Sequence, residues 1–204
     1  MVRLGTCIVV LTLLVSQTAL AEEGQGSDFA QYSVSTSVSP FGGTLGFGYN
    51  SSAKTSWQFA LGGMPSAVAP EMKVDISGTE YTVNGNSSWV GCFLNHRPIE
   101  TAKWFRLVAG LGIGSIENEV KDGAGNSFQL DYNDNPVGYL GLGFGLEPVK
   151  GFVFGFDLGI LSTAGPMASQ TEGKADGKAL EAIKDHFFFG NVLPNAQLTL
   201  GWGF

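Results

Sequence analysis

Apolar residues alternate with small or polar residues along several stretches of the chain. In residues 105–114, large apolar residues occupy the odd positions, whereas Arg106, Val108 and glycines occupy the even ones. Stretches 140–146, 151–160 and 197–204 repeat the pattern, and the apolar series of 140–146 ends at Leu146. A period of two is the period of a β-strand, whose side chains point alternately to opposite faces. The sequence therefore predicts strands with one apolar face and one small or polar face.

The alternation and the turn residues together predict eight strands. These strands are expected at residues 30–38, 43–51, 55–63, 86–96, 104–120, 136–147, 151–162 and 187–204. Short connections (52–54, 97–103, 147–151) alternate along the chain with long, polar ones (64–85, 121–135, 163–186). The connection 39–42 is the exception, because it is short but falls at the end of the long loops. An even strand number with short turns at one end and long loops at the other is typical of bacterial outer-membrane barrels. The predicted fold is all-β, an eight-stranded antiparallel up-and-down transmembrane β-barrel.

A soluble β-sandwich also alternates, so composition has to separate the two folds. The chain has 30 glycines and 24 aromatic residues among 204, and only 14% of its residues are charged. The outer face of a sandwich carries Lys, Glu and Thr, whereas the non-apolar face here is mostly glycine. A barrel in lipid explains this better, because large apolar side chains meet the acyl chains while a narrow interior accepts small ones.

The first residues have the pattern of a secretory signal peptide. Arg3 precedes an apolar run at 7–15, and Ala19-Leu20-Ala21 provides small residues before a cleavage site after Ala21. The run is shorter than the ~20 apolar residues of a membrane-spanning helix. We therefore expect residues 1–21 to be a signal peptide and 22–204 to form the barrel. The remaining part has one cysteine, Cys92, and a formal charge of −8, which argues against nucleic acid as a partner.

Two of the long connections carry weak signs of structure of their own. Residues 74–76 and 81–83 flank Ser77-Gly78 and predict a small hairpin. Residues 175–185 contain helix formers and predict a short surface helix. Six aromatic residues near strand ends are expected to form interfacial girdles. They are Trp57, Trp89, Trp104, Phe187, Phe188 and Phe189.

The inward glycines leave two interpretations of the lumen open. An eight-stranded barrel is only just wide enough for side chains to fill it. Glycines on neighbouring strands, for example Gly110, Gly141 and Gly155, leave volume for a narrow passage. Alternatively, they make room for aromatic side chains or permit the strong strand coiling of a small barrel.

The registers place two opposite charges inside the predicted barrel. Arg106 and Asp157 face inward, because a slip of one residue would put either charge in lipid at a cost of ~2–4 kcal/mol. The pair is expected either to form a polar constriction that holds the two ends of a zwitterion or to be a structural ion pair that closes the barrel. Further lumen candidates are Gln58, Asn95, Gln197 and Thr199.

Catalysis and metal binding receive little support from the sequence. A hydrolytic barrel enzyme needs a nucleophile or an activated water beside a base. The two histidines, His96 and His186, have no accompanying serine motif, and the acidic residues near 131–134 lack the EF-hand spacing. We predict no catalytic residue, no metal and no cofactor.

The chain also resembles a known family in the order of its segments. Segments 74–98 (VDISGTEYTVNGNSSWVGCFLNHRP), 136–145 (PVGYLGLGFG), 151–161 (GFVFGFDLGIL) and the final strand resemble the CarO-type small outer-membrane channels of Gram-negative bacteria. The resemblance implies an eight-stranded barrel and passive uptake of small solutes, with ornithine, glycine and other small or basic amino acids proposed for the family. The terminal Phe204 is similar to the signal read by the outer-membrane assembly machinery.

Two other roles stay open beside this resemblance. One is a closed structural or adhesive barrel that acts through its extracellular loops on surfaces, lipid or lipopolysaccharide. The other, which the histidines do not favour, is a lipid A-modifying enzyme.

Overall fold

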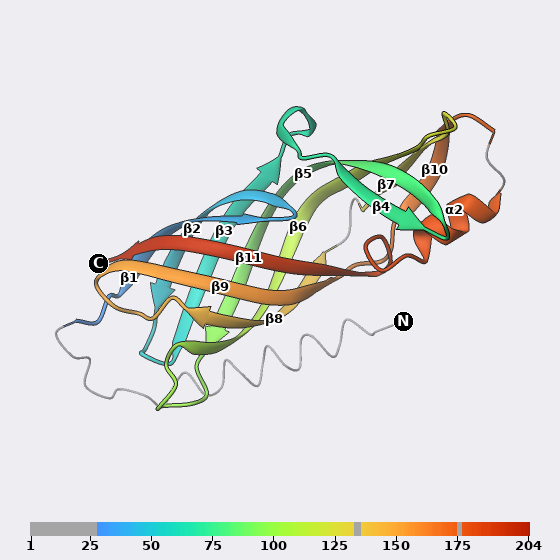
Figure 1. Cartoon of the computed structure of the whole chain (residues 1–204). Helices are drawn as coiled ribbons and strands as arrows, with labels where there is room; N and C mark the ends of the chain where they lie inside the picture. Colours follow the sequence, from blue (N-terminus) through green and yellow to red (C-terminus); the bar gives the residue numbers. More distant parts are fainter. Residues whose placement is uncertain (1–27, 133–135, 175–176) are drawn as a thin grey trace.

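The computed structural model describes residues 28–132, 136–174 and 177–204 (Figure 1). It contains eleven strands in one antiparallel sheet, one 3-10 turn and one helix within these residues. In chain order they are β1 (Tyr32–Ser39), β2 (Gly42–Asn50), β3 (Thr55–Met64), η2 (Ser66–Val68), β4 (Met72–Ile76), β5 (Thr79–His96), β6 (Phe105–Asp122), β7 (Ser127–Asp131), β8 (Val137–Gly145), β9 (Gly151–Ser162), β10 (Met167–Glu172), α2 (Gly177–Lys184) and β11 (Val192–Gly203). The predicted signal peptide, 1–21, lies outside the described residues.

Eight of the strands form a hydrogen-bonded ring. Their order is β1, β2, β3, β5, β6, β8, β9 and β11, and β11 pairs with β1. This confirms the predicted eight-stranded up-and-down barrel. The connections 51–54, 97–104 and 146–150, together with Phe204, lie at one end, which we call the short-turn end. The opposite end, which carries the extended strands and α2, is called the long-loop end (Figure 1).

The outer face of the ring is apolar over most of its height. In β6, Leu107, Leu111 and Ile113 are exposed, whereas Arg106 and Val108 are buried, as the alternation predicts. The other strands expose equivalent residues. Among them are Val34, Leu45, Phe47, Phe59, Leu61, Leu140, Leu142, Phe154, Leu158, Leu198 and Leu200. A continuous apolar band of this kind suits contact with hydrocarbon and is rare on soluble monomers.

Beyond the ring, β5 and β6 continue as part of a five-strand extension. The order of this extension is β4, β5, β6, β7 and β10. The predicted hairpin is confirmed, since β4 and β5 join through Ser77 and Gly78, whose φ angles of 55° and 84° are those of a left-handed hairpin turn. The strand expected at 86–96 therefore begins at Thr79, because it pairs first with β4 and only then with β3.

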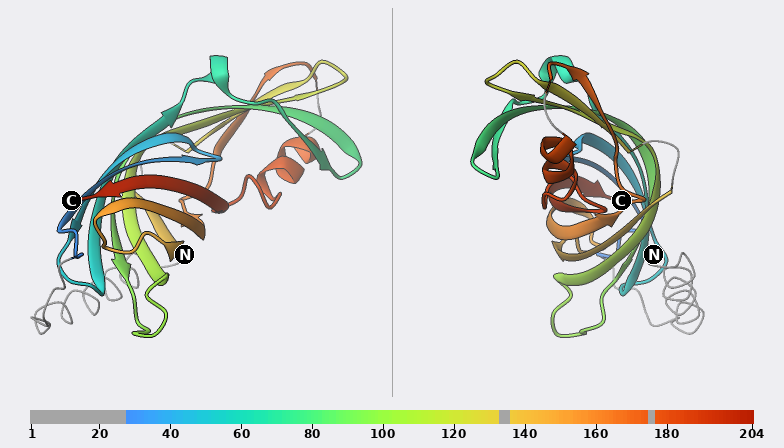
Figure 2. Two further views of the ribbon diagram at one scale, coloured as in Figure 1. Left: turned by 60° about the vertical axis from the view of Figure 1, so that its left-hand side comes forward. Right: turned by 90° about the vertical axis from the view of Figure 1, so that its right-hand side faces the viewer.

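The extension has a hydrophobic core of its own, which α2 completes. Tyr81, Val120, Phe128 and Leu130 form its sheet side, and Ile183 is the buried residue of α2. Figure 2 shows α2 beneath the arch of the extension, beside the long-loop end of the ring. The predicted helix at 175–185 is confirmed over 177–184. Within the described residues, no helix has the length and apolar character needed to cross a membrane.

Two details of the sequence prediction are wrong at this end. The last strand begins at Val192 and not at 187, because residues 187–191 form the turn that returns the chain from α2. The girdle prediction is wrong for Phe189, which is buried in the extension core. Its carbonyl accepts a hydrogen bond from Tyr132 Oη at 2.6 Å. Burial raises the pKa of the Tyr132 hydroxyl, so it stays a donor at neutral pH. Trp89 also leaves the predicted girdle, since its indole points into the barrel and donates to the carbonyl of Phe41.

Candidate functional site

Arg106 and Asp157 meet inside the barrel because the residue between them on the neighbouring strand is a glycine. Arg106 on β6 lies opposite Gly143 on β8, which lies opposite Asp157 on β9, which lies opposite Gln197 on β11. All four positions face the interior. A Cβ on Gly143 would lie 2.5 Å from Arg106 Nε and 2.6 Å from Asp157 Oδ1. The glycine therefore lets the two charged side chains meet across the strand that separates them.

Arg106 uses its whole guanidinium group within the barrel. Its Nη2 donates to Asp157 Oδ1 and Oδ2 at 2.7 and 2.6 Å, and its Nε donates to Asn95 Oδ1 at 2.9 Å. Its Nη1 donates to the carbonyls of Gly145 and Phe144 at 2.6 and 3.3 Å. All three guanidinium nitrogens therefore donate hydrogen bonds. With Arg106 1% exposed and Asp157 6% exposed, the pair is removed from water.

The pair separates two cavities along the lumen. The cavity on the long-loop side measures about 90 Å³ and has Asp157 in its wall, whereas the one on the short-turn side measures about 40 Å³ and has Arg106 in its wall. Gln58 and Asn95 line both. We call Arg106, Asp157, Asn95 and Gln58 the septum. One layer of side chains therefore divides the lumen.

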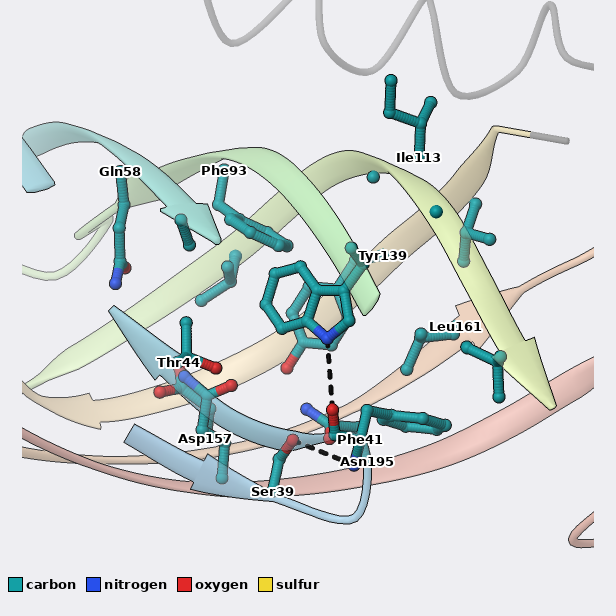
Figure 3. Close-up of a pocket in the computed structure, with 18 of the residues that line it drawn as sticks. Ser39, Phe41, Thr44, Gln58, Phe93, Ile113, Tyr139, Asp157, Leu161 and Asn195 are labelled. Atoms are coloured by element: carbon teal, nitrogen blue, oxygen red, sulfur yellow. Dashed lines mark hydrogen bonds between the residues drawn. The ribbon is translucent and has the colours of Figure 1, made fainter. Parts of the chain in front are cut away.

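Aromatic side chains form much of the cavity on the long-loop side. Phe41, Trp89, Phe93, Tyr132 and Tyr139 contribute to its wall. Figure 3 shows Phe93 and Tyr139 directed into the space between the strands, with Ile113 on the outer side of the ribbon. The Phe93 and Tyr139 rings pack edge to face at 5.7 Å.

Two polar atoms of this wall have no hydrogen-bond partner among the described residues. They are Thr44 Oγ1 and Asn195 Oδ1, and both residues are more than nine-tenths buried. The cavity therefore offers acceptors beside aromatic faces.

The structure decides between the two interpretations of the inward glycines. A Cβ on Gly110 would collide with the Phe93 ring, and one on Gly141 or Gly159 would meet Tyr139 Oη. Most of these glycines therefore make room for large inward side chains. Gly112 differs, since a Cβ added there would have Val90 O at 3.4 Å as its nearest neighbour. Gly112 also lines the cavity on the long-loop side.

The short-turn end is covered by the chain itself. Gly145 and Leu146 have φ angles of 75° and 51°, so β8 ends in two left-handed residues. The Leu146 side chain then lies over the inward face of Gly155, and Leu146 lines the short-turn cavity. The prediction that Leu146 faces outward with Leu142 is wrong, because the left-handed turn reverses its direction.

The remaining predicted lumen residues all face inward. Gln58 Nε2 donates to Ser35 Oγ at 3.5 Å, and Gln197 Nε2 donates to Thr199 Oγ1 at 3.2 Å. Thr199 is fully buried but lines neither cavity. The structure thus brings Arg106, Asp157, Asn95 and Gln58 together and leaves Thr199 as a packing residue.

Two further residues, Arg97 and Asn195, line the lumen and are not among the predicted lumen residues. Arg97 is 2% exposed and lies two residues after Asn95, so its side chain continues the inward face of β5. It was assigned to a turn because the strand was expected to end at 96. Asn195 shares the inward face of Gln197, and the same alternation identifies it.

The two histidines lie at opposite ends of the molecule. His96 ends β5 at the short-turn end and contacts Thr55 Oγ1 through Nδ1 at 3.2 Å, while His186 follows α2 and packs against Phe188 and Phe189. Among the described residues, no group of three His, Cys, Asp or Glu side chains is placed to hold a metal ion.

Solved structures of outer-membrane proteins share this fold. The structure of Acinetobacter baumannii CarO aligns with a TM-score of 0.65 at 15% identity, over 86% of this chain and 98% of that one. CarO2 of the same organism gives 0.66 at 13% identity, over 87% and 100%. A major outer-membrane protein of Thermus thermophilus gives 0.51 at 11% identity, over 85% and 98%. No protein-family model and no curated protein sequence matches the chain. These likenesses confirm the expected resemblance to CarO at the level of the fold.

Proposed function

We propose that this protein is a narrow outer-membrane channel that admits small zwitterionic solutes through the septum. The observation that carries the proposal is the division of the lumen into two cavities by a single side-chain layer that contains one cation and one anion. The apolar outer band supports a location in the outer membrane of a Gram-negative bacterium, with export through the predicted signal peptide.

The chemistry of the septum suits a solute with two opposite charges. A charged group that enters a dry, low-dielectric passage needs a partner at every step. A zwitterion supplies its carboxylate to Arg106 and its ammonium group to Asp157, so the pair exchanges partners without exposing an unpaired charge. The cavity volumes, about 90 and 40 Å³, restrict passage to solutes the size of a small amino acid.

Uptake into lipid vesicles that contain the purified chain tests this role. Labelled glycine and labelled acetamide are similar in size, but only glycine is zwitterionic. We expect glycine uptake above that of protein-free vesicles. We also expect an Arg106→Met/Asp157→Leu double variant to lose about tenfold or more of the glycine uptake relative to acetamide, because an apolar septum leaves both charges unpaired.

A charge change outside the lumen provides the matched control. Lys103 lies exposed in the 97–104 turn, and Lys103→Gln should leave both uptake rates unchanged. Well-folded wild-type barrels that admit glycine no faster than protein-free vesicles would show the channel role to be wrong.

The extension supports a second candidate, a closed barrel that acts at the cell surface. The strands β4, β7 and β10 and helix α2 form a folded layer with its own core beyond the ring. In this role the vesicles show no solute flux, and cells that display the chain lose surface attachment or lipopolysaccharide binding when 66–78 is replaced by a Gly-Ser linker.

A further inference from the structure

Two arginines share the small cavity at the short-turn end. Arg97 enters it from the end of β5, and Arg106 enters it from β6, the neighbouring strand. The Arg106 charge is compensated by Asp157, whose carboxylate belongs to the wall of the other cavity. The short-turn cavity therefore has two guanidinium groups in its wall, and the two positive charges repel each other.

Arg97 forms no direct ion pair with a carboxylate of the described residues. Its Nη1 donates to Ser56 Oγ at 3.1 Å and its Nη2 donates to the Leu146 carbonyl, while its Nε has no acceptor. Glu147 lines the same cavity and its charge attracts Arg97, but the two side chains form no direct ion pair. A buried guanidinium with an unsatisfied N–H and no carboxylate in direct contact is unfavourable, because it loses hydration and gains only part of what it loses.

The rest of the wall suits an anion as well. Hydroxyl groups of Ser33, Ser35 and Ser56 line the cavity and are able to donate to a negatively charged oxygen or halide. A volume of about 40 Å³ exceeds the roughly 10–15 Å³ that one water molecule needs, and it fits an ion of a few heavy atoms.

We propose that this cavity binds a small monovalent anion, chloride or a carboxylate of formate size, between Arg97 and Arg106. The anion supplies the directly bound negative charge that Glu147 does not provide, and it accepts from the free Nε of Arg97. This inference does not depend on transport, since the anion is able to occupy the site even in a barrel that passes no solute.

Thermal unfolding of the full chain in detergent micelles tests the site. Sodium chloride and sodium formate are compared with sodium gluconate at the same ionic strength, because gluconate is too large for the cavity. A ligand that binds only the folded state raises the unfolding midpoint, by roughly 3 °C for each tenfold excess over its dissociation constant. We expect chloride, formate or both to raise the midpoint relative to gluconate, and the two salts distinguish a halide site from a carboxylate site.

An Arg97→Gln variant should lose this anion-dependent shift, and Lys103→Gln, which removes an exposed charge at the same end, should keep it. Equal midpoints of the wild type in all three salts would overturn the proposal, and so would an unchanged shift in Arg97→Gln. Where Arg97→Gln does not fold, Arg97→Lys keeps the charge and is expected to retain a shift. The salt comparison on the wild type stands without either variant. Loss of glycine uptake with an intact anion shift would contradict the channel and leave the anion site in place.

Discussion

At the scale of single residues, the septum contains one buried ion pair. The Arg106–Asp157 pair is buried, and all three guanidinium nitrogens of Arg106 donate hydrogen bonds. Buried ion pairs are weak stabilisers, since desolvation offsets most of their attraction, but removing one partner leaves a costly buried charge. Apolar residues of similar volume would close the same lumen, so the proposed channel role and a structural ion pair make different predictions for the two charges.

A set of substitutions at the pair measures this difference. We expect Asp157→Ala to lower the free energy of unfolding in lipid vesicles by about 3–5 kcal/mol, because Arg106 keeps its charge without a partner. The double variant Arg106→Met/Asp157→Leu should lie close to the wild type. Gln197→Ala, in the same row but uncharged, is the control and should cost about 1 kcal/mol. A double variant less stable than Asp157→Ala would show that the pair is needed for folding.

At the scale of elements, β8 determines how the septum forms. Its glycine at 143 makes room for the pair, and its left-handed end at Gly145 and Leu146 directs three backbone carbonyls toward the two arginines. The same end places the Leu146 side chain over Gly155 and covers the short-turn end. The strand β8 and its end thus supply the space for the ion pair, the carbonyl acceptors for the two arginines and the side chain that covers the short-turn end.

Two alanine substitutions test the role of the glycine in β8. Gly143→Ala should lower the free energy of unfolding by about 1–3 kcal/mol, because the added Cβ overlaps both Arg106 and Asp157. Gly112→Ala on β6 adds the same methyl group where the nearest neighbour lies at 3.4 Å, and it should change stability little. Urea titration in vesicles measures both, and equal effects would contradict a specific requirement at 143.

At the scale of the whole molecule, two folded layers share β5 and β6. The ring has an apolar exterior and contains the polar septum beside a largely aromatic cavity, whereas the extension has an apolar core made mainly by residues of β4, β5, β6, β7 and α2. Within the described helix, Ile183 is the fully buried residue of α2, and Ala179, Leu180 and Ala182 pack around it against the same core. Because α2 packs on the core of the extension, we expect it to loosen while the ring stays closed.

An Ile183→Ala variant tests the separation of the two layers. Loss of a buried isoleucine side chain typically lowers stability by about 2–5 kcal/mol. Here we expect it to weaken the packing of α2 on the extension and to leave the stability of the ring unchanged. Trypsin should cut at Lys178 and Lys184 faster than in the wild type, while the unfolding midpoint of the ring stays the same. Glu181→Ala, exposed on the same helix, is the control. A lowered ring midpoint would show that the two layers unfold together.

The sequence by itself determined the barrel, its strand number and the side on which each septum residue lies. A strand alternates with a period of two, so a charge such as Arg106 or Asp157 has only one side where it avoids lipid. Local turn chemistry also sufficed for the hairpin at Ser77-Gly78 and, with helix-forming residues, for α2.

The tertiary structure decided which inward residues meet and where the lumen closes. Arg106 and Asp157 are 51 positions apart, and only the register across Gly143 makes them neighbours. The hydrophobic pattern predicts Leu146 on the outer face and Arg97 in a turn, and both predictions are wrong because strand ends depend on long-range pairing and on left-handed residues. Alternation is a local property of the backbone, whereas contact across a barrel depends on how all eight strands pair.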